Sequence, residues 1–184
     1  MKTYTIVAGV NGSGKSSLTG VLRTEITNLG KIVDVDKITV KCGGNPIEGG
    51  KQAIALIEEC LDKGICFTQE TTLSGHKTLA TIKSAIDKGY YVRLYYVGLN
   101  TVEESISRIE NRVRKGGHNI SDEDVKRRFK KRFEDLKNII EYCDEATFYD
   151  NENGFVAVAE YKNGELLPIG HYMPEWLKEL NQIL

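Results

Sequence analysis

Cysteine, proline and tryptophan are scarce in this sequence, and it contains no long apolar run. Its 184 residues include four cysteines, three prolines and one tryptophan. The cysteines have no C-x-x-C spacing and no histidines at metal-ligand intervals, which excludes the common zinc and redox motifs. No run approaches the roughly 18 apolar residues of a membrane span, and the N-terminus lacks a signal-peptide pattern. We therefore expect a cytoplasmic protein with free thiols and no membrane partner.

The sequence also has no large excess of positive or negative charge. The 25 lysines and arginines nearly balance the 26 aspartates and glutamates, so the formal net charge is -1. This balance provides no global attraction to nucleic acid or to a membrane surface. Any electrostatic specialisation must therefore be local. Because domains usually run to roughly 100 to 200 residues, we expect residues 1–184 to form a single domain.

A phosphate-binding motif follows the first apolar run. The stretch GVNGSGKSS, residues 9–17, matches the pattern G-x-x-x-x-G-K-[ST] and lies between an apolar run and a helical pattern. In such a loop the backbone N–H groups surround a phosphate chain, the lysine reaches the β- and γ-phosphates, and the next hydroxyl binds magnesium. We predict that ATP contacts Gly9, Asn11, Gly12, Ser13, Gly14, Lys15, Ser16 and Ser17. The alternative is that Lys15 only begins a helix, where its charge opposes the helix dipole.

Strand and helix patterns alternate along the chain up to residue 151. The predicted strands cover residues 3–9, 31–36, 65–72, 90–99 and 146–151. The predicted helices cover residues 15–30, 49–64, 74–89, 101–116 and 121–140. This alternation indicates an α/β fold with a parallel sheet. The tail differs, because residues 153–184 read as an antiparallel hairpin with an Asn163-Gly164 turn, followed by a short helix.

Acidic residues end two of the predicted strands. Asp36 closes the second strand, and Glu70 closes the third together with Thr71 and Thr72. The carboxyl ends of parallel strands form the edge where ligands bind, and the glycine-rich loop lies at the same edge. One acid could accept the proton of an attacking hydroxyl, while the other could hold magnesium through water. We predict substrate contacts at Asp36, Glu70, Thr71 and Thr72 and magnesium at Ser16 and Glu70, with Asp34 as an alternative to Asp36. The other interpretation is that Asp34, Asp36 and Glu70 are ordinary solvated acids at strand ends.

Basic residues concentrate in one segment. Residues 108–132 hold ten of the 25 lysines and arginines, in two helical patterns joined by KGGHNI. Helices joined by a glycine hinge suit a lid that closes over a nucleotide and supplies cations to the transferring phosphoryl group. We predict that Arg112, His118, Arg127 and Arg128 contact ATP. One alternative is a solvated basic face. The other is a nucleic-acid surface, which we do not expect; a steep salt dependence of binding would reveal it.

Five stretches together resemble the zeta-toxin-like branch of phosphate-loop kinases. They are GVNGSGKSS, VDVD, QETTLSG, RVRKGGHNI followed by RRF, and FYDN, and they extend to about Asn151. The resemblance implies a P-loop NTPase fold with a doubly wound sheet, a catalytic acid at Asp36, a substrate side at Glu70 and Thr72, and a catalytic lid arginine at Arg112. The family often has a second lid arginine where His118 stands, so Arg127 or Arg128 would compensate. Well-known members phosphorylate UDP-N-acetylglucosamine with ATP and are neutralised by an antitoxin.

The motifs together predict an ATP- and magnesium-dependent kinase acting on a hydroxyl of a small metabolite. The predicted catalytic residues are Lys15, Asp36 and Arg112. The resemblance adds a nucleotide sugar as acceptor and an antitoxin protein as partner. Two alternatives remain, a nucleotide-hydrolysing switch ATPase and a non-catalytic nucleotide-binding module. The switch lacks support because the sequence has neither an N-K-x-D motif nor an apolar strand ending in Asp-Glu.

Overall fold

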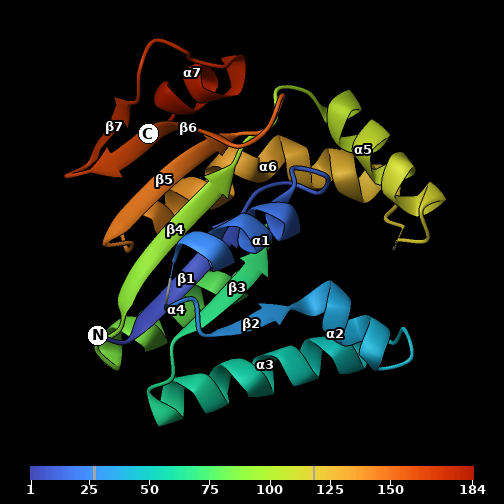
Figure 1. The fold of residues 1–184 in the computed structure, drawn as a ribbon, viewed down its shortest axis with the longest axis vertical. Helices are drawn as coiled ribbons and strands as arrows, with labels where there is room; N and C mark the ends of the chain where they lie inside the picture. Colours follow the sequence, from blue (N-terminus) through green and yellow to red (C-terminus); the bar gives the residue numbers. More distant parts are fainter. Residues whose placement is uncertain (27, 118) are drawn as a thin grey trace.

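The computed structural model describes residues 1–26, 28–117 and 119–184. One seven-stranded sheet runs through it, in the order β2-β3-β1-β4-β5-β6-β7 (Figure 1). The strands are β1 (Thr3–Ala8), β2 (Lys31–Asp34), β3 (Phe67–Thr71), β4 (Tyr91–Val97), β5 (Glu145–Asp150), β6 (Val156–Lys162) and β7 (Glu165–Pro168). The first five strands pair in parallel, and β6 and β7 continue the sheet antiparallel. The predicted α/β fold with a parallel sheet and a C-terminal hairpin is confirmed.

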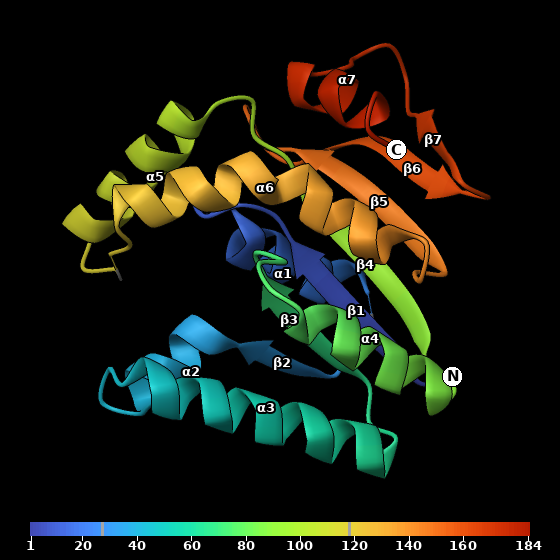
Figure 2. The same ribbon diagram turned by 180° about the vertical axis from the view of Figure 1, so that it is seen from behind.

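Helices cover both faces of this sheet. They are α1 (Lys15–Glu25), α2 (Val35–Lys41), α3 (Pro46–Lys63), α4 (Lys77–Asp87), α5 (Val102–Arg114), α6 (Asp122–Ile140) and α7 (Glu175–Asn181). Figure 2 shows α4 and α6 in front of the strands, whereas α1 lies on the opposite side. Within the described part of the chain, no helix is both long enough and apolar enough to cross a lipid bilayer.

The central strand β1 explains why a hydrophobic core forms on each face of the sheet. All six of its residues are buried, because β3 and β4 flank it and helices cover both of its faces. Tyr4 and Ile6 point into the larger core, which α3, α4, α6 and α7 complete. Val7 points the other way and packs with Leu18 and Leu22 of α1. This alternation is that of a strand whose successive side chains face opposite sides of the sheet.

The ends of the predicted elements are set by local caps. At the start of α5, in the capping sequence Thr101-x-x-Glu104, Thr101 accepts a hydrogen bond from the Glu104 backbone N–H. Ser121 caps α6 through the Asp124 backbone N–H in the same way. The turn between β6 and β7 has Asn163 and Gly164 at φ 55° and 85°, the left-handed conformations that this type of hairpin turn requires.

The predicted end of the second strand is wrong. We expected it to run to Asp36, but β2 ends at Asp34 and helix α2 begins at Val35. The reason is that the Asp34 carboxylate accepts a 3.1 Å hydrogen bond from the Lys37 backbone N–H and so caps a helix. Asp36 therefore lies in the first turn of α2, not at a strand end.

Candidate functional site

The loop between β1 and α1 is compact and open at the helix end. A Cβ atom at Gly9 would lie 2.4 Å from the Val97 carbonyl oxygen, and one at Gly14 would lie 2.4 Å from Asn151 Nδ2. Gly14 precedes α1 in a left-handed conformation with φ 102°, and no described side chain caps this helix. The first N–H groups of α1 are therefore free to bind an anion, which the helix dipole also favours.

Lys15 folds back over this loop. Its Nζ donates hydrogen bonds of 2.9 Å to the carbonyl oxygens of Gly9 and Val10. Burial lowers the pKa of Lys15 to about 8, while the nearby carboxylates of Glu70 and Asp36 act in the opposite direction. The ammonium group thus occupies a poorly solvated position among acids. A bound phosphate would restore the preference for its charged form.

Ser16 and Glu70 are brought together from α1 and β3. Ser16 Oγ donates a 2.5 Å hydrogen bond to Glu70 Oε2. Glu70 is 9% exposed, and its Oε1 atom is buried without a hydrogen-bond partner among the described residues. A hydroxyl and a carboxylate are the oxygen ligands that magnesium takes beside nucleotide phosphates. The two residues predicted for magnesium therefore fit such an ion together.

A cavity of about 520 Å³ opens beside the loop. Asp34 and Asp36 both line it, but their surroundings differ. Asp34 is buried, caps α2 and forms a 3.0 Å ion pair with Lys37. Asp36 is exposed, and no hydrogen bond or ion pair to it occurs among the described residues. Asp36 is thus the carboxylate of the two that is available to a ligand.

The other predicted loop and substrate residues divide between cavity wall and support. Those that line the cavity are Asn11, Gly12, Gly14, Lys15, Ser16, Ser17, Glu70, Thr71 and Thr72. Gly9 and Ser13 are packed behind the loop and do not line it. Thr71 Oγ1 accepts a hydrogen bond from the Leu73 backbone N–H, and Thr72 Oγ1 donates one to Ser74 Oγ. These hydroxyls fix the turn after β3 at the edge of the cavity.

The cations predicted for a lid do not all face the cavity. Arg112 and Arg128 line it, and Arg128 Nη1 donates a 3.2 Å hydrogen bond to Asn11 Oδ1. Arg127 lies on the neighbouring face of α6, where it forms a 2.6 Å ion pair with Asp124 and lines a different cavity. The structure therefore does not bring Arg127 to the phosphate loop. His118, the other predicted lid contact, lies outside the described residues.

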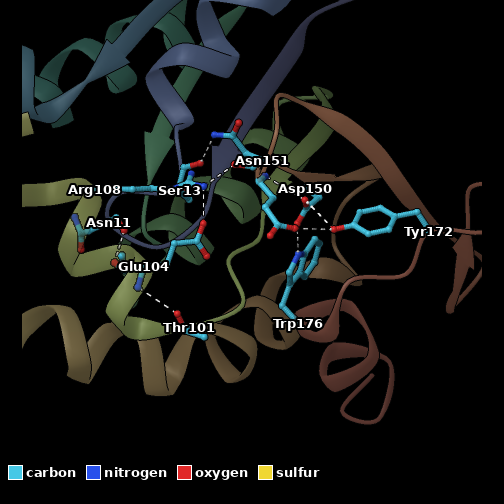
Figure 3. Close-up of polar contacts among 11 residues, drawn as sticks. Asn11, Ser13, Thr101, Glu104, Arg108, Asp150, Asn151, Tyr172 and Trp176 are labelled. Carbon is cyan, nitrogen blue, oxygen red and sulfur yellow. Dashed lines mark hydrogen bonds and ion pairs between the residues drawn. The ribbon is translucent and has the colours of Figure 1, made fainter. Parts of the chain in front are cut away.

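Among the residues beside the loop that escaped the sequence prediction are Arg108 and Asn151 (Figure 3), and Ser105, whose Oγ donates a 2.5 Å hydrogen bond to the Asn11 carbonyl oxygen. Arg108 Nη2 donates hydrogen bonds of 2.5 Å to Glu104 and 2.6 Å to the Asn151 carbonyl oxygen, and Arg108 lines the cavity. Asn151 Nδ2 donates a 3.0 Å hydrogen bond to the Ser13 carbonyl oxygen. Arg108 lies one helical turn before Arg112, so the i, i+4 spacing was a signal for it. Asn151 has only its place at the end of FYDN as a signal.

Contacts from the C-terminal segment hold the end of β5 in place. Asp150 is buried, and it accepts a 2.8 Å hydrogen bond from Trp176 Nε1 and one of 3.3 Å from the Tyr172 hydroxyl (Figure 3). The Trp176 ring packs so closely on Gly98 that a Cβ there would lie 2.2 Å from it. The C-terminal segment is thus tied to the residue that precedes Asn151.

The chain is similar to known proteins in family, in sequence and in structure. The zeta toxin family model matches residues 48–159. An uncharacterized protein of Haemophilus influenzae is 37% identical over 126 residues, which cover 66% of this chain and 88% of that protein. A structure of the PezAT chromosomal toxin-antitoxin system of Streptococcus pneumoniae aligns with a TM-score of 0.68 at 16% identity, covering 100% of this chain and 84% of that one.

A further structural neighbour is the AvrRxo1-ORF1:-ORF2 complex with ATP. It aligns with a TM-score of 0.70 at 14% identity and covers 100% of this chain, but this chain spans only 63% of that one. At such identities the structural matches establish the fold. The family match begins after the phosphate loop, so the geometry of residues 9–17 stands as an independent observation.

Proposed function

Because this chain belongs to the zeta toxin family, we propose that it is an ATP- and magnesium-dependent kinase that transfers the γ-phosphoryl group to a hydroxyl of a small metabolite. The observation that carries the proposal is the joint placement of Lys15, the Ser16–Glu70 pair and Asp36 around one cavity. A phosphate-binding element, an ion-binding pair and an available carboxylate are the parts that phosphoryl transfer needs.

Binding of ATP falls to the phosphate loop and the arginines. The open N–H groups at the start of α1 cradle the phosphate chain, and Lys15 exchanges its two carbonyl partners for phosphate oxygens. Arg108, Arg112 and Arg128 line the same cavity and stabilise the negative charge of the transition state. Ser16 and Glu70 would hold magnesium, which supplies further charge neutralisation at the phosphates.

Asp36 acts as the general base in this scheme. The acceptor hydroxyl passes its proton to the Asp36 carboxylate as the oxygen–phosphorus bond forms, and the bond from the γ-phosphorus to the bridging oxygen breaks with ADP as leaving group. Asp34 is less suited because its carboxylate already caps α2 and pairs with Lys37. Most of the rate enhancement then comes from positioning and charge stabilisation.

For the acceptor we propose a nucleotide sugar, with UDP-N-acetylglucosamine as the first compound to test, because the family resemblance implies it. An antitoxin protein is proposed as partner on the same ground, and the PezAT neighbour belongs to a toxin-antitoxin system. The protein is incubated with γ-labelled ATP, magnesium and either UDP-N-acetylglucosamine or a metabolite extract, and the labelled product is identified by mass spectrometry.

The outcomes separate the candidate functions. A labelled metabolite that is absent with the Lys15→Met variant supports the kinase. Labelled phosphate released without any labelled acceptor would instead indicate a nucleotide-hydrolysing switch. ATP binding without turnover under any condition would indicate a non-catalytic binding module. A Lys130→Gln variant serves as control, because Lys130 is an exposed lysine that lines neither cavity.

A further inference from the structure

A second cavity, of about 820 Å³, lies along α6 on the side of Arg127. Helix α6 supplies much of its wall, from Arg127 to Ile140, which at 1.5 Å per residue makes it about 20 Å long. The start of α4, Tyr161 of β6 and the C-terminal Leu184 complete it. We call this cavity the α4–α6 groove. It adjoins the cavity at the phosphate loop, because Ser74 and Arg128 line both.

The groove is cationic at the end nearest the phosphate loop. Arg127, Arg128 and Lys131 lie there with His76, and the nearest acid lining the groove is Asp135. Burial raises the pKa of the Asp135 carboxyl group, and the nearby charges of Lys131, His76 and Arg127 act to lower it. Asp124 pairs with Arg127 from outside the groove. The Nε atom of Arg128, a residue that lines both cavities, is buried without a hydrogen-bond partner among the described residues, whereas its Nη1 atom donates to Asn11 Oδ1.

The far end of the groove has a different chemistry. Ile139, Ile140 and the half-buried rings of Tyr142 and Tyr161 form its wall, together with Leu184. Lys137 and Glu141 also line this end, and Lys137 donates a 2.6 Å hydrogen bond to the Ile183 carbonyl oxygen. The groove thus has a cationic end near the phosphate loop and a more apolar end farther along α6. Phosphate or carboxylate groups suit the first, and an aromatic or aliphatic body suits the second.

The turn between the two cavities is strained. Leu73 has φ 63°, although it is not glycine, and its side chain is 3% exposed. Its backbone N–H donates to Thr71 Oγ1, and its neighbour Ser74 lines both cavities. A left-handed conformation at a buried leucine costs free energy and persists where the surrounding structure requires it, often beside a ligand site.

We propose that the α4–α6 groove binds the part of the acceptor remote from its reacting hydroxyl, so that the acceptor has an anionic group beside Arg127, Arg128 and Lys131 and an apolar or aromatic body toward Tyr142 and Tyr161. That the ligand of the groove is a phosphoryl acceptor rests on the proposed kinase function. Binding of a ligand in the groove is nevertheless measurable without turnover. It adds a subsite on α6 that lies outside the cavity of Lys15 and Asp36.

The binding test uses 1-naphthyl phosphate as a fluorescent probe, with the phosphate loop filled by magnesium and a non-hydrolysable ATP analogue. We expect saturable binding that weakens at least tenfold in Arg127→Gln and Lys131→Gln, and neutral 1-naphthol to bind at least tenfold more weakly than the phosphate. Lys126→Gln and Lys130→Gln are matched controls, because they remove a charge from exposed positions of α6 that do not line the groove. Equal affinities in all four variants, or no saturable binding, would overturn the proposal.

The kinetic test uses the acceptor that the labelling experiment identifies. We expect Lys131→Gln to raise the KM for that acceptor at least tenfold while the KM for ATP stays within twofold of the parent value. An unchanged acceptor KM, together with lost probe binding, would show that the groove is not the acceptor subsite and would overturn the proposal. If no acceptor is phosphorylated and probe binding behaves as expected, the kinase function fails and the groove stands as an anion-binding site of another role.

Discussion

Ser16 Oγ and Glu70 Oε2 lie 2.5 Å apart, joined by a hydrogen bond from the first turn of α1 to the end of β3. The contact places a hydroxyl and a carboxylate next to the phosphate loop, where the sequence alone had suggested both as magnesium ligands. The second carboxylate oxygen of Glu70 is buried and has no hydrogen-bond partner in the described chain. The pair therefore provides a defined test of the proposed magnesium site.

Glu70→Gln is expected to raise the magnesium concentration needed for half-maximal phosphoryl transfer by at least tenfold. The amide keeps the size of the side chain and can still accept the Ser16 hydrogen bond, but it lacks the negative charge that attracts the ion. The measurement is a magnesium titration of the labelled-ATP assay at saturating ATP. Glu58→Gln, on the exposed face of α3, is the control, and an unaltered magnesium requirement in Glu70→Gln would remove Glu70 from the ion site.

Affinity for magnesium-ATP is expected to fall as the pH rises above about 8. Burial lowers the pKa of Lys15 to about 8, so the free protein loses the ammonium charge above that pH. A bound phosphate raises this pKa again, and binding then requires proton uptake, which weakens affinity by up to tenfold per pH unit. Calorimetric titration between pH 7 and 9.5 measures this. Lys15→Arg should show no such decline, and a parallel decline in both proteins would assign it to another group.

Lys15→Met is expected to weaken phosphoryl transfer roughly 100-fold or more without loss of stability at pH 7. Because the pKa of Lys15 is lowered on folding, its charged form is less favourable in the folded chain, and this cost is present below pH 8 and disappears as the lysine deprotonates. Removing the charge should therefore leave the free energy of unfolding equal or higher. Urea denaturation beside the transfer assay tests both parts, and a destabilised variant would contradict the second.

Asp36→Asn is expected to slow transfer to the acceptor by about 100-fold to 10,000-fold, the usual contribution of a general base. ATP affinity should change little, because in the proposed mechanism the loop and the arginines hold the triphosphate. Asp34→Asn is the matched comparison, since Asp34 caps α2 and pairs with Lys37, and its loss should lower stability more than chemistry. Lost ATP binding in Asp36→Asn would make Asp36 part of the magnesium site, whereas unchanged transfer would move the base to Glu70 or Asp34.

Magnesium-ATP is expected to slow amide hydrogen exchange in residues 108–117 and 119–132 if this segment closes over the nucleotide. Arg112 and Arg128 line the cavity, so bound phosphates would link α5 and α6 to the loop. Strand β4, buried in the sheet, is the internal reference. Exchange that stays the same across the segment on addition of ATP would count against a lid.

Much of the fold was predictable from the sequence because the signals are local. The buried run of β1, the glycine loop, the Thr101 and Ser121 caps and the Asn163-Gly164 turn each depend on residues within a few positions of one another. Hydrophobic spacing and capping act at that range. The phosphate loop and the five stretches that carry the family resemblance are likewise short local patterns.

The tertiary structure decided what distant residues do together. Asp34 became a helix cap, which moved Asp36 from a strand end into α2. Arg128 reaches Asn11 and Asn151 reaches Ser13, across separations of 117 and 138 residues, while the neighbouring Arg127 faces the α4–α6 groove. Which side of a helix meets a cavity depends on how that helix packs on the sheet, and that packing is settled by the whole core. No pattern of adjacent residues encodes which side of a helix faces the cavity. The sequence by itself therefore determined the loop and its chemistry, whereas tertiary packing determined which side chains complete the site.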